Sequence, residues 1–436
     1  MKTTKTMWVM LIALLTATSC SETETEIDPE PGSGGQVALG ITPNLKVDAG
    51  TKAATKSVVS GEKITYTDYN SAPGLGVLVT NSTSTGWYKP DETGSGYTGH
   101  HVRYIGDGNG ANWISITDKK SSYDQKNEVP YYLTKTVGKV YAYYPYNEDL
   151  GISSISSESN LKIQVKVLTT GEIDASTNNA RKYWDVNKWS QPSSKGTPVN
   201  LSLSTENDYL YFDATESGRY VNNGRAEGQT PVTPEADPDN TNDKNPGYKI
   251  NLNMKHAMAM VSFRVYDGGH LSDKDVKFTT FKIKNHTDGS SLFKTGEGYM
   301  SLTDGAITGP STTTGMTRTI TGYILMRQVE EGGKEGEHAF VQNGKTSSSV
   351  NGQTVSKTVS ALVYPIESFD DNEIDVEITL QEGENPVVVY QVTLPANNWS
   401  AGDNYIYTFS AGRNKLTIMD VTVEKWNDVD QVEIPL

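Results

Sequence analysis

Alternation of apolar and polar residues with a period of two is the feature that most constrains the fold of this chain. Clear runs are Leu161–Leu168 and Leu416–Trp426. Such alternation predicts strands that bury one face. No stretch sustains a helical period over the length of a helix, and turn residues separate the runs at short spacing. This pattern is typical of β-sandwich domains, so the sequence predicts an all-β fold.

Strands are expected along the chain from residue 36 onward. The 24 tyrosines favour strands and the 40 glycines mark turns. Gly138 is expected to turn a hairpin, and Pro145 is expected to end its second strand or to lie at a sheet edge. The main expected strands are 36–47, 74–80, 113–116, 131–137, 139–146, 161–168, 208–213, 248–266, 276–285, 319–325, 359–365, 373–380, 387–394, 405–409 and 415–426.

Residues 218–247 interrupt the strand pattern. They contain three prolines among Asn, Gly and Asp, with almost no apolar residues. A chain of 436 residues is long enough for two or three domains. We therefore expect one domain at 36–217, a linker or insert at 218–247, and a second domain at 248–436.

The first 19 residues have the pattern of an export signal. Two lysines precede the apolar run Met7–Leu15, and small residues lead to Cys20, the single cysteine of the chain. The run is far shorter than the roughly 20 residues of a membrane span. The segment resembles a bacterial lipoprotein signal, which predicts a lipid, with palmitate among its chains, on Cys20. The alternative is an incidental cysteine near an ordinary cleavage site.

Residues 20–35 are acidic, rich in Pro and Gly, and nearly free of apolar residues. Such a composition predicts a flexible tether. An acidic run directly after the lipidated cysteine resembles the surface-export signal of Bacteroidetes-type lipoproteins. A plain solvated linker is the alternative.

The C-terminal stretch 415–436 reads as a strand, an Asn427–Asp428 turn and a short apolar end at Ile434 and Leu436. Strict alternation would place Leu416, Ile418, Asp420, Thr422, Glu424 and Trp426 on one face. It would place Thr417, Met419, Val421, Val423 and Lys425 on the other. Chain ends fray unless they pair with something, so this end is expected to pair with its own domain or another molecule.

The formal net charge of −15, from 38 basic and 53 acidic residues, argues against nucleic acid as a partner. Gly344–Thr346 resembles the end of a P-loop, but Ala339 stands where the first glycine is required. His100 and His101 would face opposite sides of a strand, so they predict no metal set. No catalytic set is visible either, and we predict neither an enzyme nor a cofactor.

Asp237, Asp239 and Asp243 have a spacing that suggests a calcium loop, but Asn242 and Tyr248 exclude an EF-hand. A solvated linker is expected there, with a non-standard calcium site as the alternative. A cluster of tyrosines predicts core packing in paired strands, with a sugar-stacking platform as the alternative. These are Tyr131, Tyr132, Tyr141, Tyr143, Tyr144 and Tyr146.

Several short motifs, taken in order, resemble the fimbrillins, the type V pilins of Bacteroidetes. After the lipoprotein-like leader and first strand, they are Thr51-Lys-Ala53, Tyr141-Ala-Tyr-Tyr-Pro-Tyr146, Asp208-Tyr-Leu-Tyr211, Met254-Lys-His-Ala-Met-Ala-Met-Val261, Trp399-Ser-Ala-Gly-Asp-Asn-Tyr405, and a final strand with Trp426. The segment 218–247 has no counterpart in this pattern.

The resemblance implies two transthyretin-like β-sandwich domains in tandem and a structural subunit of cell-surface fimbriae that supports adhesion. The precursor would be anchored to the outer membrane by its lipid. A trypsin-like protease would then cut after a basic residue and release the first strand. Other pilin subunits would be the partners, because the C-terminal strand of one subunit would fill the groove of the next.

Carried onto this sequence, the resemblance makes 36–56 the removable strand and cleavage loop. Lys52 or Lys56 would be the cut site, whereas the best-known fimbrillin site uses arginine. The donor segment would be 415–436. Its donated side chains would be Leu416, Ile418, Val421, Val423, Val429, Val432, Ile434 and Leu436. The alternative is a fimbrial tip adhesin, or a stand-alone surface lipoprotein, that binds glycans or host ligands.

Overall fold

The structure, a computed structural model, describes part of the chain. The described residues are 37–45, 74–81, 102–106, 113–116, 131–133, 138–147, 161–175, 208–213, 219–222, 249–268, 271, 274–287, 290–330, 338–342 and 358–425. All regular secondary structure within these residues is β-strand, which confirms the all-β fold class.

The strands before residue 222 are β1 (Val37–Ala38), β2 (Gly40–Leu45), β3 (Leu75–Asn81), β4 (Val102–Gly106), β5 (Trp113–Ile116), β6 (Tyr132–Leu133), β7 (Gly138–Tyr144), β8 (Lys162–Val167), β9 (Thr170–Asp174), β10 (Leu210–Phe212) and β11 (Tyr220–Val221). Several expected strands are confirmed here, and β8 follows the predicted alternation at every position.

The later strands are β12 (Lys249–His256), β13 (Ala259–Asp267), β14 (Val276–Asn285), β15 (Gly296–Ser301), β16 (Ile307–Thr308), β17 (Met316–Thr321), β18 (Met326–Glu330), β19 (His338–Gln342), β20 (Val359–Val363), β21 (Ile366–Phe369), β22 (Ile374–Glu382), β23 (Val388–Thr393), β24 (Asn397–Trp399), β25 (Asp403–Ala411) and β26 (Leu416–Lys425).

Three sheets organise most of these strands. The first has the order β2-β12-β10-β7-β3-β4-β5, with β11 beside β7. The second has the order β19-β18-β13-β25-β26, with β20 beside β13, and the third β23-β22-β14-β17-β9. Smaller sheets join β1 to β6, β21 to β24, and β16 to β15 to β8.

The buried side chains form two large hydrophobic cores. The N-terminal core comes from residues 37–144 and 210–254. The C-terminal core comes mainly from residues 161–175 and 257–416. The strand β7 serves both, because Val140, Ala142 and Tyr144 lie in the first core while Tyr141 and Tyr143 lie in the second. Both faces of β7 are therefore buried, as is usual for a central strand.

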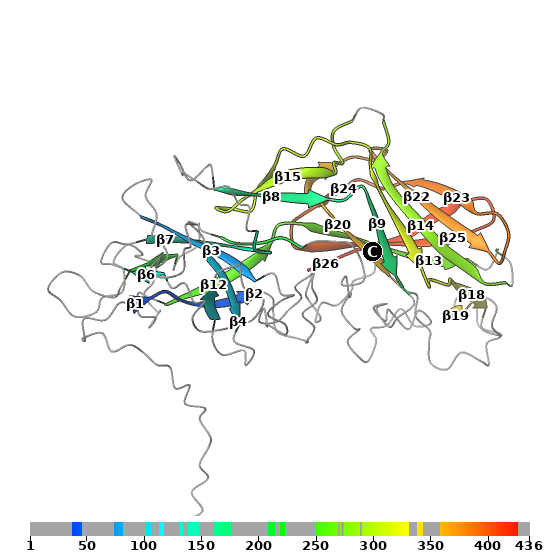
Figure 1. Ribbon diagram of the computed structural model, residues 1–436. Coiled ribbons are helices and arrows are strands. Elements are labelled where there is room, and N and C mark those ends of the chain that lie inside the picture. The colour runs from blue at the N-terminus through cyan, green and yellow to red at the C-terminus, as the bar shows by residue number, and fades with distance from the viewer. Residues whose placement is uncertain are drawn as a thin grey trace, which may run out of the picture. The chain divides into compact units, whose positions relative to one another are not determined.

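The chain passes between the two cores more than once. β8 pairs with β15 (Figure 1). β9 likewise pairs with β17, although 218–247 separates both pairs of strands in sequence. Residues 36–436 form one compact unit by their contacts. The division into domains at 36–217 and 248–436 stays a prediction, and most of 218–247 lies outside the described residues.

The expected strand 248–266 is divided between the two cores. β12 pairs with β10 and β2, whereas β13 pairs with β20 and β25. At the break, the buried His256 places its Nδ1 3.0 Å from Oδ2 of the buried Asp208. The backbone amide of Ala257 donates to Tyr209 O at 2.8 Å. These contacts fix the point at which the chain leaves one sheet for the other.

The predicted hairpin around Gly138 is wrong. β6 pairs with β1, whereas β7 pairs with β3 and β10. The reason is that both edges of β7 are occupied, by β3 on one side and by β10 and β11 on the other, so no edge is left for β6. β7 does end at Tyr144, directly before Pro145, as predicted.

Gly76 in β3 lies opposite Tyr143 of β7, and a β-carbon there would overlap the tyrosine ring. Because Tyr143 is fully buried, the ring has no free space into which to move. We expect Gly76→Ala to lower the free energy of unfolding by about 1–3 kcal/mol or more. Gly412→Ala is the control, because its β-carbon would meet a single backbone oxygen at 3.6 Å. Denaturant unfolding of both variants checks this, and equal stabilities would contradict it.

Candidate functional site

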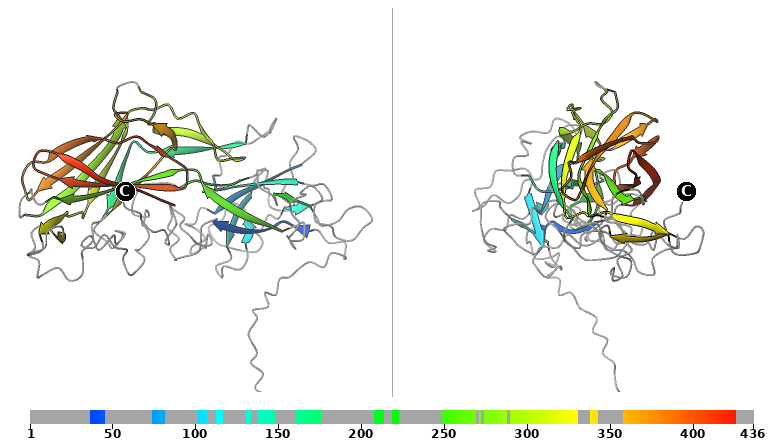
Figure 2. Two further views of the ribbon diagram at one scale, coloured as in Figure 1. Left: turned by 180° about the vertical axis from the view of Figure 1, so that it is seen from behind. Right: turned by 90° about the vertical axis from the view of Figure 1, so that its right-hand side faces the viewer.

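The first strand segment, Val37–Leu45, lies at a sheet edge and buries alternate side chains. β2 runs parallel to β12, from Gly40 opposite Lys249 to Leu45 opposite Met254 (Figure 2). Val37, Leu39, Ile41 and Pro43 are all buried. Proline is tolerated at a sheet edge because one side of the strand needs no ladder donor. This segment therefore closes one edge of the N-terminal core.

Hydrogen bonds to the backbone of Leu39 hold the middle of the segment. The amide of Leu39 donates to Tyr131 O at 2.8 Å, and the Tyr104 hydroxyl donates to Leu39 O at 3.3 Å. Burial raises the pKa of Tyr104 above its usual value, so its hydroxyl keeps its proton and can still donate in alkaline solution. The segment is thus held both by side chains in the core and by hydrogen bonds from the neighbouring strands.

Tyr104 was missed as a site residue in the sequence. Its strand, β4, lies in a glycine-rich stretch and spans five residues, so its alternation is too short to separate from the turns around it. The apolar residues Val102, Tyr104 and Ile105 were the available signal, and all three are buried.

The C-terminal strand β26 pairs antiparallel with β25 from Leu416 to Lys425. Four of the predicted donor residues, Leu416, Ile418, Val421 and Val423, therefore belong to a sheet of their own chain. The other four, Val429, Val432, Ile434 and Leu436, lie outside the described residues. Their role stays a prediction.

The predicted division of β26 into two faces is wrong. Phe409 lies opposite Ile418 and Thr408 lies opposite Asp420, so Met419 is the extra residue of a bulge. A bulge shifts the alternation by one residue. Ile418 and Val421 consequently pack against the same core, although strict alternation puts them on opposite faces.

Cys20, Lys52 and Lys56 lie outside the described residues, as do the histidine pair 100–101, the P-loop-like 344–346 and the aspartates between 237 and 243. Among the six tyrosines of the predicted cluster, Tyr132 and Tyr146 are half-buried, whereas the other four are core residues, as predicted. Tyr131, Tyr141 and Tyr143 are fully buried and Tyr144 is nearly so. These rings cannot form a sugar-stacking platform.

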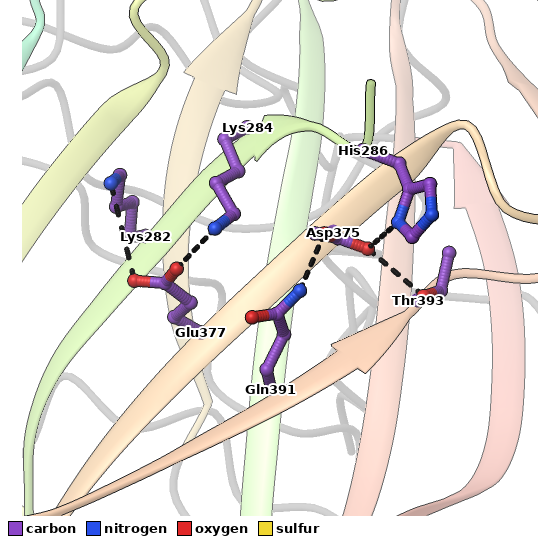
Figure 3. Close-up of polar contacts among 7 residues, drawn as sticks. All are labelled: Lys282, Lys284, His286, Asp375, Glu377, Gln391 and Thr393. Atoms are coloured by element: carbon purple, nitrogen blue, oxygen red, sulfur yellow. Dashed lines mark hydrogen bonds and ion pairs between the residues drawn. The ribbon is translucent and has the colours of Figure 1, made fainter. Parts of the chain in front are cut away.

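A polar cluster crosses β14, β22 and β23 (Figure 3). The nearly buried Asp375 accepts from Gln391 Nε2 at 2.6 Å and Thr393 Oγ1 at 2.9 Å, and its Oδ1 lies 2.9 Å from His286 Nδ1. Glu377 pairs with Lys284 and, at 4.0 Å, with Lys282. Because these groups satisfy one another across neighbouring strands, the cluster fixes strand register.

Across the described ranges, no three His, Cys, Asp or Glu side chains gather as a metal site would require. In the same ranges, no helix is long and apolar enough to cross a membrane.

Comparison with known proteins gives one family match. Residues 236–426 match the model of the fimbrillin-like family, somewhat less than half of the chain. No curated protein matches the chain significantly.

Solved structures with low similarity accompany this match. A fimbrial protein from Bacteroides vulgatus ATCC 8482 is 12% identical with a TM-score of 0.44, over 89% of this chain and 99% of that one. A fimbrial assembly protein from Parabacteroides distasonis ATCC 8503 is 12% identical with a TM-score of 0.33, over 92% and 99%. The tip fimbrial protein Mfa3 from Porphyromonas gingivalis, with C-terminal truncation, is 9% identical with a TM-score of 0.30, over 81% and 93%.

The family match is the informative comparison, because similarity to structures at this level supports no conclusion about function. It spans the strands from β12 to β26, which include the predicted motifs at Met254–Val261 and Trp399–Tyr405. The resemblance predicted from those motifs is confirmed by this match, and residues 236–426 are similar to the fimbrillin-like family.

Proposed function

We propose that this chain is a structural subunit of cell-surface fimbriae that supports adhesion and polymerises by exchange of its first strand. The observation that carries the proposal is the placement of Val37–Leu45 at the edge of the first sheet, with alternate side chains in the core. The fimbrillin-like match of residues 236–426 supports it independently.

Release of the first strand would open a groove along β12. The groove would have unpaired backbone groups on β12 and, beside Val37 and Ala38, on β6, with vacant sites for Val37, Leu39, Ile41 and Pro43. Burial of one such apolar side chain stabilises by about 1.5–3 kcal/mol, so an empty groove is costly. A donated strand would restore both the main-chain hydrogen bonds and the apolar contacts.

The donor segment is proposed to be residues 427–436. Because β26 already pairs with β25 over its whole length, donation of Leu416–Val423 would first break that pairing. The remaining residues Val432, Ile434 and Leu436 have the same spacing as Val37, Leu39 and Ile41. One apolar residue at every second position is what the vacated sites require.

Export and processing complete the proposal. The signal at 1–19 directs export, lipid on Cys20 anchors the precursor to the outer membrane, and the tether 20–35 spaces the folded part from the lipid. A trypsin-like protease then cuts after Lys52 or Lys56, which follow the last residue of β2, Leu45, by seven and eleven residues. Cleavage there would separate the first strand from the rest of the chain.

Trypsin treatment of the purified precursor tests this function. We expect a cut at Lys52 or Lys56, followed by ladders that resist heat and SDS. A variant with Lys52→Gln and Lys56→Gln should resist the cut and stay monomeric. The control Lys166→Gln alters an exposed lysine within the paired strand β8 and should polymerise like the parent. Cleavage that yields monomers alone would refute strand exchange.

A further inference from the structure

The strand β26 leaves one edge of the second sheet open among the described strands. It has β25 as its paired neighbour and stands at the end of the order β19-β18-β13-β25-β26. An open edge presents a row of backbone N–H and C=O groups that can pair with another strand. The question is which strand covers this edge before the subunit assembles.

Apolar side chains at this edge remain uncovered. Met419 is 53% exposed and Val423 is 47% exposed, and both are among the large apolar residues that the described part of the chain leaves at the surface. Val421, between them, is half-buried and packs against the C-terminal core. Another strand beside β26 would cover these positions.

The chain itself supplies a segment of suitable length. β26 ends at Lys425, and the segment 427–436 begins two residues later with the turn-forming pair Asn427–Asp428. A two-residue turn fixes the register of a hairpin. We propose that residues 429–436 fold back as an additional antiparallel strand on the open edge of β26 in the uncut subunit.

In the register of this hairpin, apolar residues of one strand stand opposite apolar residues of the other. A two-residue turn places Val432 opposite Val423 and Ile434 opposite Val421. Directly opposed side chains in antiparallel strands share a face, so Val432 and Ile434 lie on the face that carries Val421 and Val423. A register shifted by one residue would put Glu433 opposite Val423 instead.

Charge agrees with this register. Lys425 stands opposite Asp430, an opposite-charge pair, and Glu424 stands opposite the uncharged Gln431. No like charges stand directly opposite each other between 421–425 and 430–434. Opposed like charges would be destabilising, whereas an opposed pair of unlike charges contributes to pairing.

In the uncut subunit, the hairpin would keep the donor segment 427–436 paired with β26 of its own chain. This consequence, unlike the hairpin itself, rests on the proposed function. The same apolar residues that would fill a neighbour's groove are paired within their own subunit until a groove opens. Assembly then requires that the segment leave β26.

A disulfide tests the register in the uncut subunit, with Cys20→Ser to remove the single native cysteine. Val423→Cys with Val432→Cys should form an intramolecular disulfide under mild oxidation. Val423→Cys with Glu433→Cys is the control, because its side chains would lie on opposite faces. We expect a yield about tenfold higher for the first pair. Equal yields, or intermolecular disulfides alone, would overturn the proposal.

Hydrogen exchange checks the unmodified sequence. Deletion of residues 427–436 should accelerate amide exchange in β26 and leave β22, in the third sheet, unchanged. Unchanged exchange in β26 would overturn the hairpin. Because both experiments use uncut monomers, they can fail while trypsin-induced polymerisation succeeds, and the reverse also holds.

Discussion

A subunit that lacks residues 427–436 is expected to fold and to be cut normally, yet to form no polymer with itself. All ten residues of β26 would remain, and their pairing with β25 would still cover the C-terminal core. The deletion removes only the segment that is proposed to fill the groove of a neighbour. Cleavage would open a groove that no subunit in the sample could fill.

The same deletion should act on the wild-type protein in a mixture. The truncated subunit can accept a donor strand but has none to offer, so it should end each growing chain and shorten the ladders in proportion to its fraction. Gln431→Ala is the matched control, because it alters a polar position and keeps Val432, Ile434 and Leu436. Normal ladders from the truncated subunit alone would show that the donor lies elsewhere.

Trp399→Ala is expected to have the largest effect on stability among single substitutions in the C-terminal core. The Trp399 ring is fully buried and meets Phe369 edge to face at 5.3 Å and Phe293 at 6.1 Å between ring centroids. Its Nε1 donates to the hydroxyl of the buried Tyr407 at 3.0 Å. Truncation would leave a cavity and take away a hydrogen-bond partner of Tyr407.

We expect Trp399→Ala to lower the free energy of unfolding by about 3–5 kcal/mol, a large fraction of the stability of an ordinary domain. Trp399→Phe keeps most of the aromatic contact and should cost clearly less. Urea unfolding, followed by far-UV circular dichroism, measures both. A loss below about 1 kcal/mol for the alanine variant would mean that the site collapses to fill the cavity.

The sequence predicts the strands of this protein well and their partners poorly. Alternation in Leu161–Leu168 identifies β8 because one face of that strand is buried. The pairing of β8 with β15 is a contact between segments far apart in the chain, and period-two alternation is the same whichever strand lies alongside. For the same reason, the sequence could not assign β6 to β1.

Bulges and breaks within strands are also hard to predict from the alternation of apolar residues. In the sequence of β26, the apolar positions change from even to odd numbers between Ile418 and Met419, but only the match of β26 with β25 shows that this change is a bulge. The break between β12 and β13 falls at Ala257 and Met258, the start of the apolar run Ala257–Val261, so hydrophobicity continues from the break into β13 although the sheet changes. The fimbrillin resemblance implied that the first strand is removable, but it did not predict its edge position or the contacts of Tyr104 and Tyr131 that hold it.

The central claim is that the first strand must leave before subunits join, and a reversible lock tests it most directly. Ala38 of β1 lies opposite Tyr132 of β6 in an antiparallel pair, a separation that a disulfide can span. Ala38→Cys with Tyr132→Cys, together with Cys20→Ser, should therefore tie the first strand to the N-terminal core even after trypsin has cut the chain.

The measurement is SDS-resistant ladder formation by this cut variant before and after reduction. The account predicts monomers while the disulfide is intact and ladders once a reductant releases the strand, whereas the Cys20→Ser parent should form ladders under both conditions. Ladders that form with the disulfide intact would contradict strand exchange at this groove.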